Sequence, residues 1–275
     1  VAEWSQDETF DDGITEIFTA PTADEVATFT HTTELDDGTW FFRVYAVDNA
    51  GNESSPSDPG SVLIDTQDPS DPGKPTVTEA NEADIVSTGD ITVTWTASSD
   101  DGGSGLANPA YTFEYSQDDD FDDSDIITTN TPSVELELTE GRWYFQVWAT
   151  DLAGNTSGQT PGEVLVDLTP PSAPGAPSGP AAVVGDTQVL ITWDPSTDDI
   201  SEVDFYTIEY SQNSDFTGST TADTADDTNS IELTLADGTW YMQVWATDLA
   251  GHESNESDPG EVTVDTQAPI ISELQ

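Results

Sequence analysis

Two sets of aspartates have the residue type and the spacing to bind a metal ion. The second set repeats the first at a distance of about 100 residues. The members are Asp65, Asp100, Asp101 and Asp151 in the first set and Asp167, Asp198, Asp199 and Asp248 in the second. Carboxylate oxygens are the ligands that Ca²⁺ prefers, and the ion takes about six to eight oxygens. The sets therefore predict calcium sites. The alternative is that each aspartate caps its own turn through side-chain hydrogen bonds.

The other motifs that could bind a metal ion or catalyse a reaction are poor matches to known sites. The segment 118–125 is rich in aspartate, but it lacks the central glycine of an EF-hand, and Thr129 stands where the bidentate glutamate belongs. His31 and His252 are the only histidines, and His252 occupies a turn position that asparagine holds in two other copies of the same pattern. It is therefore interpreted as a turn residue and not as a base. With 56 acidic residues, carboxylate pairs arise by chance, so no glycosidase-like pair and no enzyme activity is predicted.

Aromatic residues recur on one face of a predicted strand in each copy of this pattern. They are Phe41 and Tyr45, Tyr144 and Trp148, and Tyr241 and Trp245. Exposed aromatic rings on a flat sheet bind sugar rings or another protein. The favoured interpretation is that side chains of neighbouring strands cover them as cross-strand pairs. A lateral protein contact comes next, and a sugar-binding platform comes last.

Three glycosylation sequons follow the same predicted strand. They begin at Asn52, Asn155 and Asn255. The motif is short and also arises by chance. Its position directly after a strand predicts that an attached glycan would face solvent.

The element that has to position these residues is a β-strand that occurs three times, in segments 38–52, 141–155 and 238–252. In the middle copy, Phe145 and Val147 alternate with Tyr144 and Trp148, which is the period of a strand with one buried face. Further alternating runs between turn residues predict the other strands of one complete repeat. These are 75–79, 90–97, 110–116, 125–128, 133–138, 142–150 and 161–167. Seven short strands of this kind predict an all-β, antiparallel sandwich.

The repeat defines the predicted domain organisation. Residues 69–170 and 171–268 are each a complete repeat, and 269–275 begin a following one. Residues 2–7 match 113–118, so 1–68 are interpreted as a partial repeat without its first two strands. The simplest expectation is that these strands belong to an adjoining segment of the same polypeptide. The alternative is that a neighbouring chain supplies one, for example a strand that continues from Pro269.

Composition limits the environment and the partners. The 275 residues include 56 acidic and three basic ones, which gives a formal net charge of −53. Nucleic acid and anionic membrane surfaces are therefore excluded as direct partners, because both would be repelled. The charge also opposes folding, so we expect concentrated salt or bound cations to offset it. The chain has no cysteine, and no apolar run is long enough to insert into a membrane.

The repeats resemble fibronectin type III or related immunoglobulin-like repeats of large bacterial and archaeal surface proteins. The matching residues are Trp95 and Trp193, Tyr111 and Tyr206, the Asp-x-Ala-Gly ending of the thrice-repeated strand, and the closing segments 64–69, 166–170 and 264–269. The resemblance covers nearly the whole chain and implies tandem sandwiches arranged as a rod. One departure is that Trp40, Trp143 and Trp240 replace the corner tyrosine of the family. An indole has no hydroxyl group, so this corner has to differ from the standard one.

This fold implies a place for the aspartates. The last strand of one sandwich runs into the next beside two loops of the latter, which brings Asp65 toward Asp100, Asp101 and Asp151. The same relation brings Asp167 toward Asp198, Asp199 and Asp248. The glycines of segment 102–105 would let the backbone approach an ion closely.

The predicted function is structural or adhesive. We expect a cation-stabilised segment of an extracellular, multi-repeat protein of a saline or marine microbe, in a surface layer, filament or adhesin stalk. Its partners would be further repeats of the same chain, copies of itself and glycans. The alternative is a set of accessory carbohydrate- or protein-binding repeats of a secreted polysaccharide-degrading enzyme.

Overall fold

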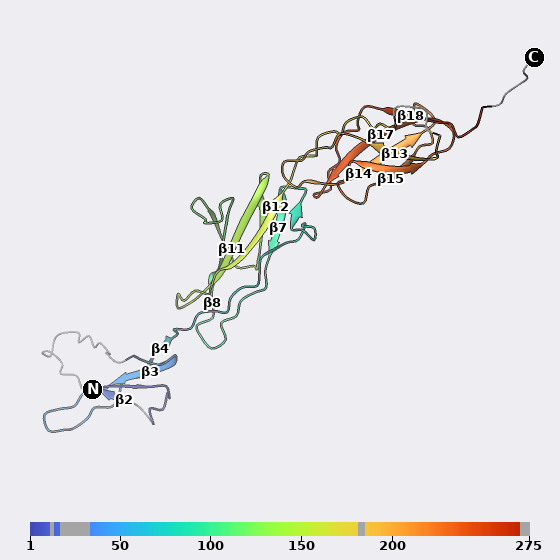
Figure 1. Ribbon diagram of the computed structural model, residues 1–275. Helices are drawn as coiled ribbons and strands as arrows, with labels where there is room; N and C mark the ends of the chain where they lie inside the picture. Colours follow the sequence, from blue (N-terminus) through green and yellow to red (C-terminus); the bar gives the residue numbers. More distant parts are fainter. Residues whose placement is uncertain (12–13, 17–33, 181–184, 270–275) are drawn as a thin grey trace, which may run out of the picture. The chain divides into compact units, whose positions relative to one another are not determined.

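The computed structural model describes residues 1–11, 14–16, 34–180 and 185–269 of the chain (Figure 1). Within these ranges all regular structure is β-strand, in sheets that form sandwich-like arrangements, so the predicted all-β class is confirmed. The chain divides into two compact units. One contains residues 1–76, 94–134 and 144–162, and the other contains 77–93, 135–143 and 163–275. No helix in the described ranges has the length and apolar character needed to cross a bilayer.

The first repeat contributes one four-stranded antiparallel sheet with the order β2-β1-β3-β4. Its strands are β1 (Ala2–Ser5), β2 (Ile14–Glu16), β3 (Gly38–Val44) and β4 (Gly60–Ile64). Trp4 lies opposite Phe42, and their rings are 5.3 Å apart. Trp40 lies opposite Val62 on the neighbouring strand. The alternation of the sequence thus sets the register, because a shift of one residue would turn every side chain to the other face.

The middle repeat forms two sheets, with the orders β10-β7-β5 and β6-β12-β11-β8-β9. The strands are β5 (Thr76–Val77), β6 (Ile85–Val86), β7 (Asp90–Thr94), β8 (Leu106–Ser116), β9 (Asp125–Thr129), β10 (Ser133–Glu137), β11 (Gly141–Asp151) and β12 (Thr160–Val166). Seven of them fall within or beside the predicted ranges. The eighth, β6, was not predicted, and it pairs with β12 in a parallel direction.

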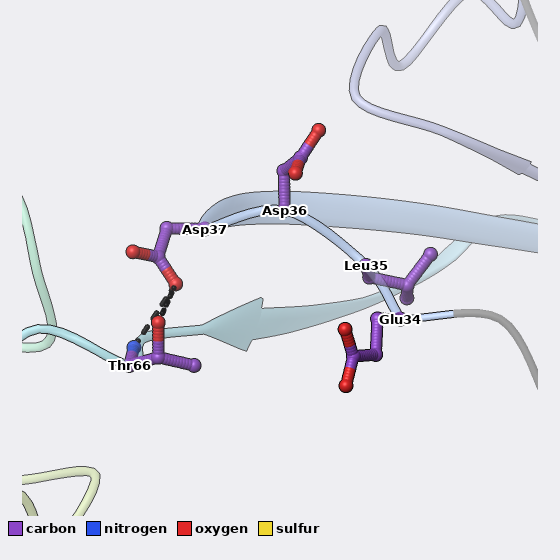
Figure 2. Close-up of a pocket in the computed structure, with 5 residues that line it drawn as sticks. All are labelled: Glu34, Leu35, Asp36, Asp37 and Thr66. Carbon is purple, nitrogen blue, oxygen red and sulfur yellow. Dashed lines mark hydrogen bonds between the residues drawn. The ribbon is translucent and has the colours of Figure 1, made fainter.

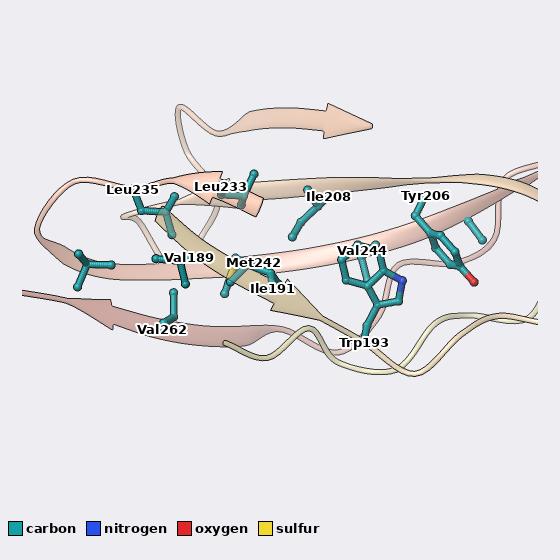
Figure 3. Packing of buried hydrophobic residues seen from close by; sticks show 12 residues of the cluster. Val189, Ile191, Trp193, Tyr206, Ile208, Leu233, Leu235, Met242, Val244 and Val262 are labelled. Carbon is teal, nitrogen blue, oxygen red and sulfur yellow. The ribbon is translucent and has the colours of Figure 1, made fainter. Parts of the chain in front are cut away.

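The third repeat forms a two-stranded sheet, β13-β16, and a four-stranded sheet, β15-β14-β17-β18. The strands are β13 (Gln188–Thr192), β14 (Val203–Ser211), β15 (Thr220–Asp223), β16 (Ser230–Thr234), β17 (Gly238–Asp248) and β18 (Gly260–Val264). Figure 3 shows how side chains of the two sheets meet in the core, with Trp193 and Tyr206 toward one end. Their rings are 5.4 Å apart and meet edge to face. The Tyr206 hydroxyl accepts a 2.8 Å hydrogen bond from the Ser196 amide, which satisfies a buried polar group.

Burial follows the predicted alternation in the second and third repeats. Phe145 and Val147 on β11, and Met242 and Val244 on β17, are all 0% exposed. The corresponding residues of the first repeat behave differently, since Phe42 is 36% and Val44 is 43% exposed. Val62 on the adjacent strand β4 is also 40% exposed. The described part of this repeat holds a single sheet, and its apolar face is unevenly covered, because Trp40 on the same face is only 8% exposed.

Glycine is required where the thrice-repeated strand begins. Gly38, Gly141 and Gly238 have φ values of 127°, 125° and 134°, a backbone conformation that other residues rarely adopt. In two repeats a glutamine that directly follows an earlier strand, β1 or β14, bonds to this turn. Gln6 and Gln212 each donate through Nε2 to the carbonyl oxygen of the residue before the glycine, at 3.1 Å. In these two repeats the glutamine thus fixes the turn at which the glycine begins the strand.

Candidate metal sites

Asp65, Asp100 and Asp151 lie together in the first compact unit. Asp65 directly follows β4, Asp100 lies in the loop after β7, and Asp151 is the last residue of β11. Each offers a carboxylate oxygen, and these oxygens lie within 4.8 Å of one another. Gly103 faces this group closely, since a Cβ atom there would lie 2.5 Å from Asp65 Oδ2. The sequence predicted both the grouping of these three aspartates and the close approach of the glycine-rich backbone.

Protein hydrogen bonds already occupy much of this first group. Asp65 Oδ2 accepts from the Ser104 amide at 2.6 Å, and Asp100 Oδ2 accepts from the Gly105 amide at 2.7 Å. Asp151 Oδ2 accepts from Asn155 Nδ2 at 2.8 Å. Hydrogen bonds from Ser104 hold the pKa of the Asp65 carboxyl below its usual value. The contacts of Asp100 and Asp151 are those of aspartates that cap their own turns, whereas the contact of Asp65 with Ser104 links two distant segments of the chain. Calcium at this group stays a prediction.

Asp167, Asp248 and His252 form a second group, in the other compact unit. Asp167 directly follows β12, Asp248 is the last residue of β17, and His252 lies in the turn after it. Their facing ligand atoms also lie within 4.8 Å of one another. Both carboxylates are buried, with 0% exposure for Asp167 and 1% for Asp248. The His252 side chain is 24% exposed, and its Nδ1 lies 3.3 Å from Asp248 Oδ2.

The second group differs from the first in its hydrogen bonding. Asp167 Oδ1 accepts from the Thr169 amide at 3.0 Å, and Asp248 Oδ1 accepts from the His252 amide at 2.8 Å. In the described part of the chain, the buried atoms Asp167 Oδ2, Asp248 Oδ2 and His252 Nδ1 have no hydrogen-bond partner. Burial raises the pKa of the Asp248 carboxyl, and the negative charges of Asp167 and Asp198 raise it further.

The structure places the remaining predicted metal ligands differently. Asp101 and Asp199 are exposed and belong to neither group. Asp198 is near enough to influence Asp248, but its Oδ1 caps a turn by accepting from the Ile200 and Ser201 amides. His252 was interpreted from the sequence as a turn residue only. Its turn position is correct, since the Asp248 amide donates to the His252 carbonyl, but its ring also faces a buried carboxylate.

A hollow of about 500 Å³ beside the first repeat is lined by Glu34, Leu35, Asp36, Asp37 and Thr66 (Figure 2). The Asp37 carboxylate in this hollow already accepts hydrogen bonds from other protein groups. Asp37 Oδ1 accepts from the Thr66 amide at 3.0 Å and from the Thr66 hydroxyl at 2.8 Å, while Oδ2 accepts from Gln67 Nε2. Asp237 binds Thr266 through the same pair of contacts in the third repeat. The aspartate therefore ties a turn to the end of the last strand of its repeat.

The six predicted contact aromatics are all partly covered. Phe41, Tyr45, Tyr144, Trp148, Tyr241 and Trp245 each have intermediate exposure. On β11, Trp148 lies opposite Thr112 of β8, and Tyr144 lies opposite Ser116. Such rings give a partly shielded surface and not an open aromatic platform.

The three sequons differ in accessibility. Asn52 and Asn255 are exposed. Asn155 is partly buried, and its Nδ2 donates both to Asp151 Oδ2 and to the Asp65 carbonyl, at 2.8 and 3.2 Å. Because a glycan is attached to that nitrogen, modification of Asn155 would have to break both hydrogen bonds.

Comparison with known proteins gives one informative similarity. No family model matches the chain. The chain is 32% identical over 268 residues to exoglucanase B of Cellulomonas fimi, an alignment that covers 92% of this chain and 22% of that protein. It also matches the crystal structure of the chicken CNTN1 FN1-FN3 domains with a TM-score of 0.40 and 16% identity, over 82% of this chain and 75% of that one. The chain thus spans about a fifth of the curated relative that it matches.

Proposed function

We propose that the chain is a non-catalytic accessory segment of a secreted polysaccharide-degrading enzyme. The observation that carries this proposal is the 32% identity to exoglucanase B across nearly the whole chain. The matched part is 22% of that protein, which leaves room outside it for a catalytic domain. The aromatic rings are partly covered, and in the hollow of the first repeat Asp37 and Thr66 are bonded to each other, which supports a spacer more than a sugar-binding module. In this role the chain would be extracellular.

The experiment compares the full-length gene product with a version that lacks residues 1–269. We expect hydrolysis of a soluble oligosaccharide to be unchanged and hydrolysis of insoluble glucan to fall. The purified chain itself should release no sugar. Loss of both activities, or of neither, would contradict a spacer function.

Sugar binding is the variant of this proposal in which the chain itself contacts the substrate. Sedimentation of the purified chain with insoluble cellulose tests it. The spacer function predicts that the wild type and the Trp148→Ala/Trp245→Ala variant both stay in the supernatant. Retention of the wild type alone would assign the aromatic face to substrate binding.

A structural role in a surface layer, filament or adhesin stalk is the second candidate, and the net charge of −53 with tandem repeats favours it. A strongly charged surface stays hydrated and resists aggregation in salt. Ordered assemblies of the native protein, together with a full-length sequence that has no hydrolase domain, would support this candidate over the accessory function.

A further inference from the structure

The group of Asp167, Asp248 and His252 has an electrostatic arrangement that is unfavourable without a cation. Two carboxylates with 0% and 1% exposure lie together in the second compact unit. Water cannot solvate buried charges of like sign, so they need opposite charge or hydrogen-bond donors. The described residues contribute one backbone amide to each carboxylate, from Thr169 to Asp167 and from His252 to Asp248. Both bonds go to Oδ1, and the second oxygen of each carboxylate has no hydrogen bond in the described structure.

The three residues come together, and each has a buried atom without a hydrogen bond. One ligand atom of each residue lies within 4.8 Å of the other two. In the described structure the buried atoms without a hydrogen bond are Asp167 Oδ2, Asp248 Oδ2 and His252 Nδ1, and the last two are 3.3 Å apart. A neutral imidazole nitrogen without its proton presents a lone pair, as the two oxygens do. Unused lone pairs on three neighbouring residues define a place for a positive charge.

We propose that Asp167 Oδ2, Asp248 Oδ2 and His252 Nδ1 bind one divalent transition-metal cation of the zinc type, with solvent completing the coordination. Bond lengths of about 2.0–2.2 Å around a tetrahedral ion place neighbouring ligand atoms about 3.4 Å apart. The observed 3.3 Å between His252 Nδ1 and Asp248 Oδ2 matches this spacing. Because the His252 side chain is partly exposed, an ion has a route from solvent.

Comparison of His252 with the equivalent residue of the first group explains why we propose a zinc-type ion here and not the predicted calcium. There, Asn155 replaces the histidine, and its amide donates to Asp151 Oδ2 and to the Asp65 carbonyl. An amide donor satisfies the acceptors without an ion. An imidazole nitrogen adds a ligand that zinc, cobalt, nickel and copper bind well, whereas Ca²⁺ prefers oxygen ligands only. Replacement of asparagine by histidine thus changes a hydrogen-bonded turn into a metal site.

The test uses Co²⁺ as a visible probe on the purified chain after chelator treatment, in concentrated NaCl to suppress diffuse binding to the other carboxylates. The expected result is one equivalent of Co²⁺ with d–d absorption bands, displaced by one equivalent of Zn²⁺ and not by excess Ca²⁺. The same equivalent of Zn²⁺ should raise the unfolding temperature, because an ion that binds only the folded state stabilises it.

The chain offers a test variant and a matched control, because it has two histidines. His252→Asn installs the residue found at the same turn in the other two repeats, so it should fold, and we expect it to lose the Co²⁺ bands and the shift with Zn²⁺. His31→Asn should keep both. Asp167→Asn, checked for native circular dichroism, is a second variant that should lose both.

The competing explanation is that a proton takes the place of the metal, so that an imidazolium Nδ1–H donates to Asp248. In that case the wild type would give no Co²⁺ bands and no thermal shift with Zn²⁺, and the proposal would be overturned. Bands that persist in His252→Asn would overturn it as well, because they would place the ion elsewhere.

Discussion

At the scale of single residues, the tryptophan at the start of the repeated strand forms a corner of its own kind. The indole Nε1 of Trp40, Trp143 and Trp240 donates to the backbone carbonyl four residues earlier, at 2.8, 2.8 and 2.9 Å. The sequence predicted that this corner would differ from a tyrosine corner, because an indole is only a donor. The structure adds the acceptor, which is a carbonyl in the turn before the strand in all three repeats.

Trp143→Phe should therefore weaken the second repeat by about 0.5–1.5 kcal/mol, the net value of one hydrogen bond. The ring that packs on the sheet is largely kept, so the loss comes mainly from the missing N–H. Hydrogen exchange of the β11 amides measures the change locally. Trp148→Phe removes an indole from the opposite face of the same strand and serves as the control. Equal effects of the two substitutions would contradict a specific role for the corner.

The two candidate metal groups differ in how far their members could be predicted from the sequence. Asp65, Asp100 and Asp151 could be brought together from the sequence because each follows a recognisable strand end. The proposed role of His252 could not be predicted from the sequence, since it rests on the burial of Asp248 and on the proximity of Asp167, which lies far earlier in the chain. The one available signal was the exchange of asparagine for histidine at an otherwise repeated turn.

At the scale of elements, strands with alternating apolar residues were predictable and short pairings were not. The predicted 142–150 and 133–138 correspond to β11 and β10 within one residue at each end. Strand β6 has two residues and no alternation, so only its partner β12 defines it. The long Leu106–Ser116 strand starts before the predicted 110, where the pairing with β11 has a register irregularity that no local pattern indicates.

Corresponding apolar residues on β11 and β3 should contribute differently to the stability of their repeats. Phe145→Ala should destabilise the second repeat by about 3–5 kcal/mol, because it leaves a cavity in a closed core. Phe42→Ala, at the corresponding position of β3, should cost about 0.5–1.5 kcal/mol, since Phe42 is already 36% exposed and loses mainly its contact with Trp4. Hydrogen exchange of β11 in the first variant and of β3 in the second measures each effect in its own sheet.

Two results would oppose this difference. An equal loss of protection in the two variants would mean that the face of the first sheet is closed in solution. A small effect of Phe145→Ala would mean that the β11 core relaxes around the missing ring. Phe145→Leu, which keeps more of the apolar volume, should fall between the wild type and the alanine variant.

At the scale of the whole molecule, folding has to overcome mutual repulsion of the carboxylates. The formal net charge is −53, and the chain has three basic side chains to offset it. Two of these already pair with nearby groups. Arg43 Nε lies 2.5 Å from Glu3 Oε2, and its guanidinium lies over the Phe10 ring. Arg142 Nη1 lies 3.5 Å from Glu163 Oε2. We therefore expect most of the neutralising charge to come from cations in solution. The composition alone leads to this prediction, because it depends on the number of charges and not on the arrangement of the strands.

The unfolding temperature should accordingly rise as NaCl is increased from about 0.01 M to about 1 M, because the screening length falls from about 30 Å to about 3 Å. The rise reflects weaker repulsion in the compact state, in which the carboxylates lie closer together than in the unfolded chain. Differential scanning calorimetry of the chelator-treated chain measures it. Choline chloride at equal ionic strength should give a similar rise, whereas sucrose at equal osmolality separates screening from general exclusion effects. A flat or falling midpoint across the NaCl series would show that repulsion is balanced within the protein itself.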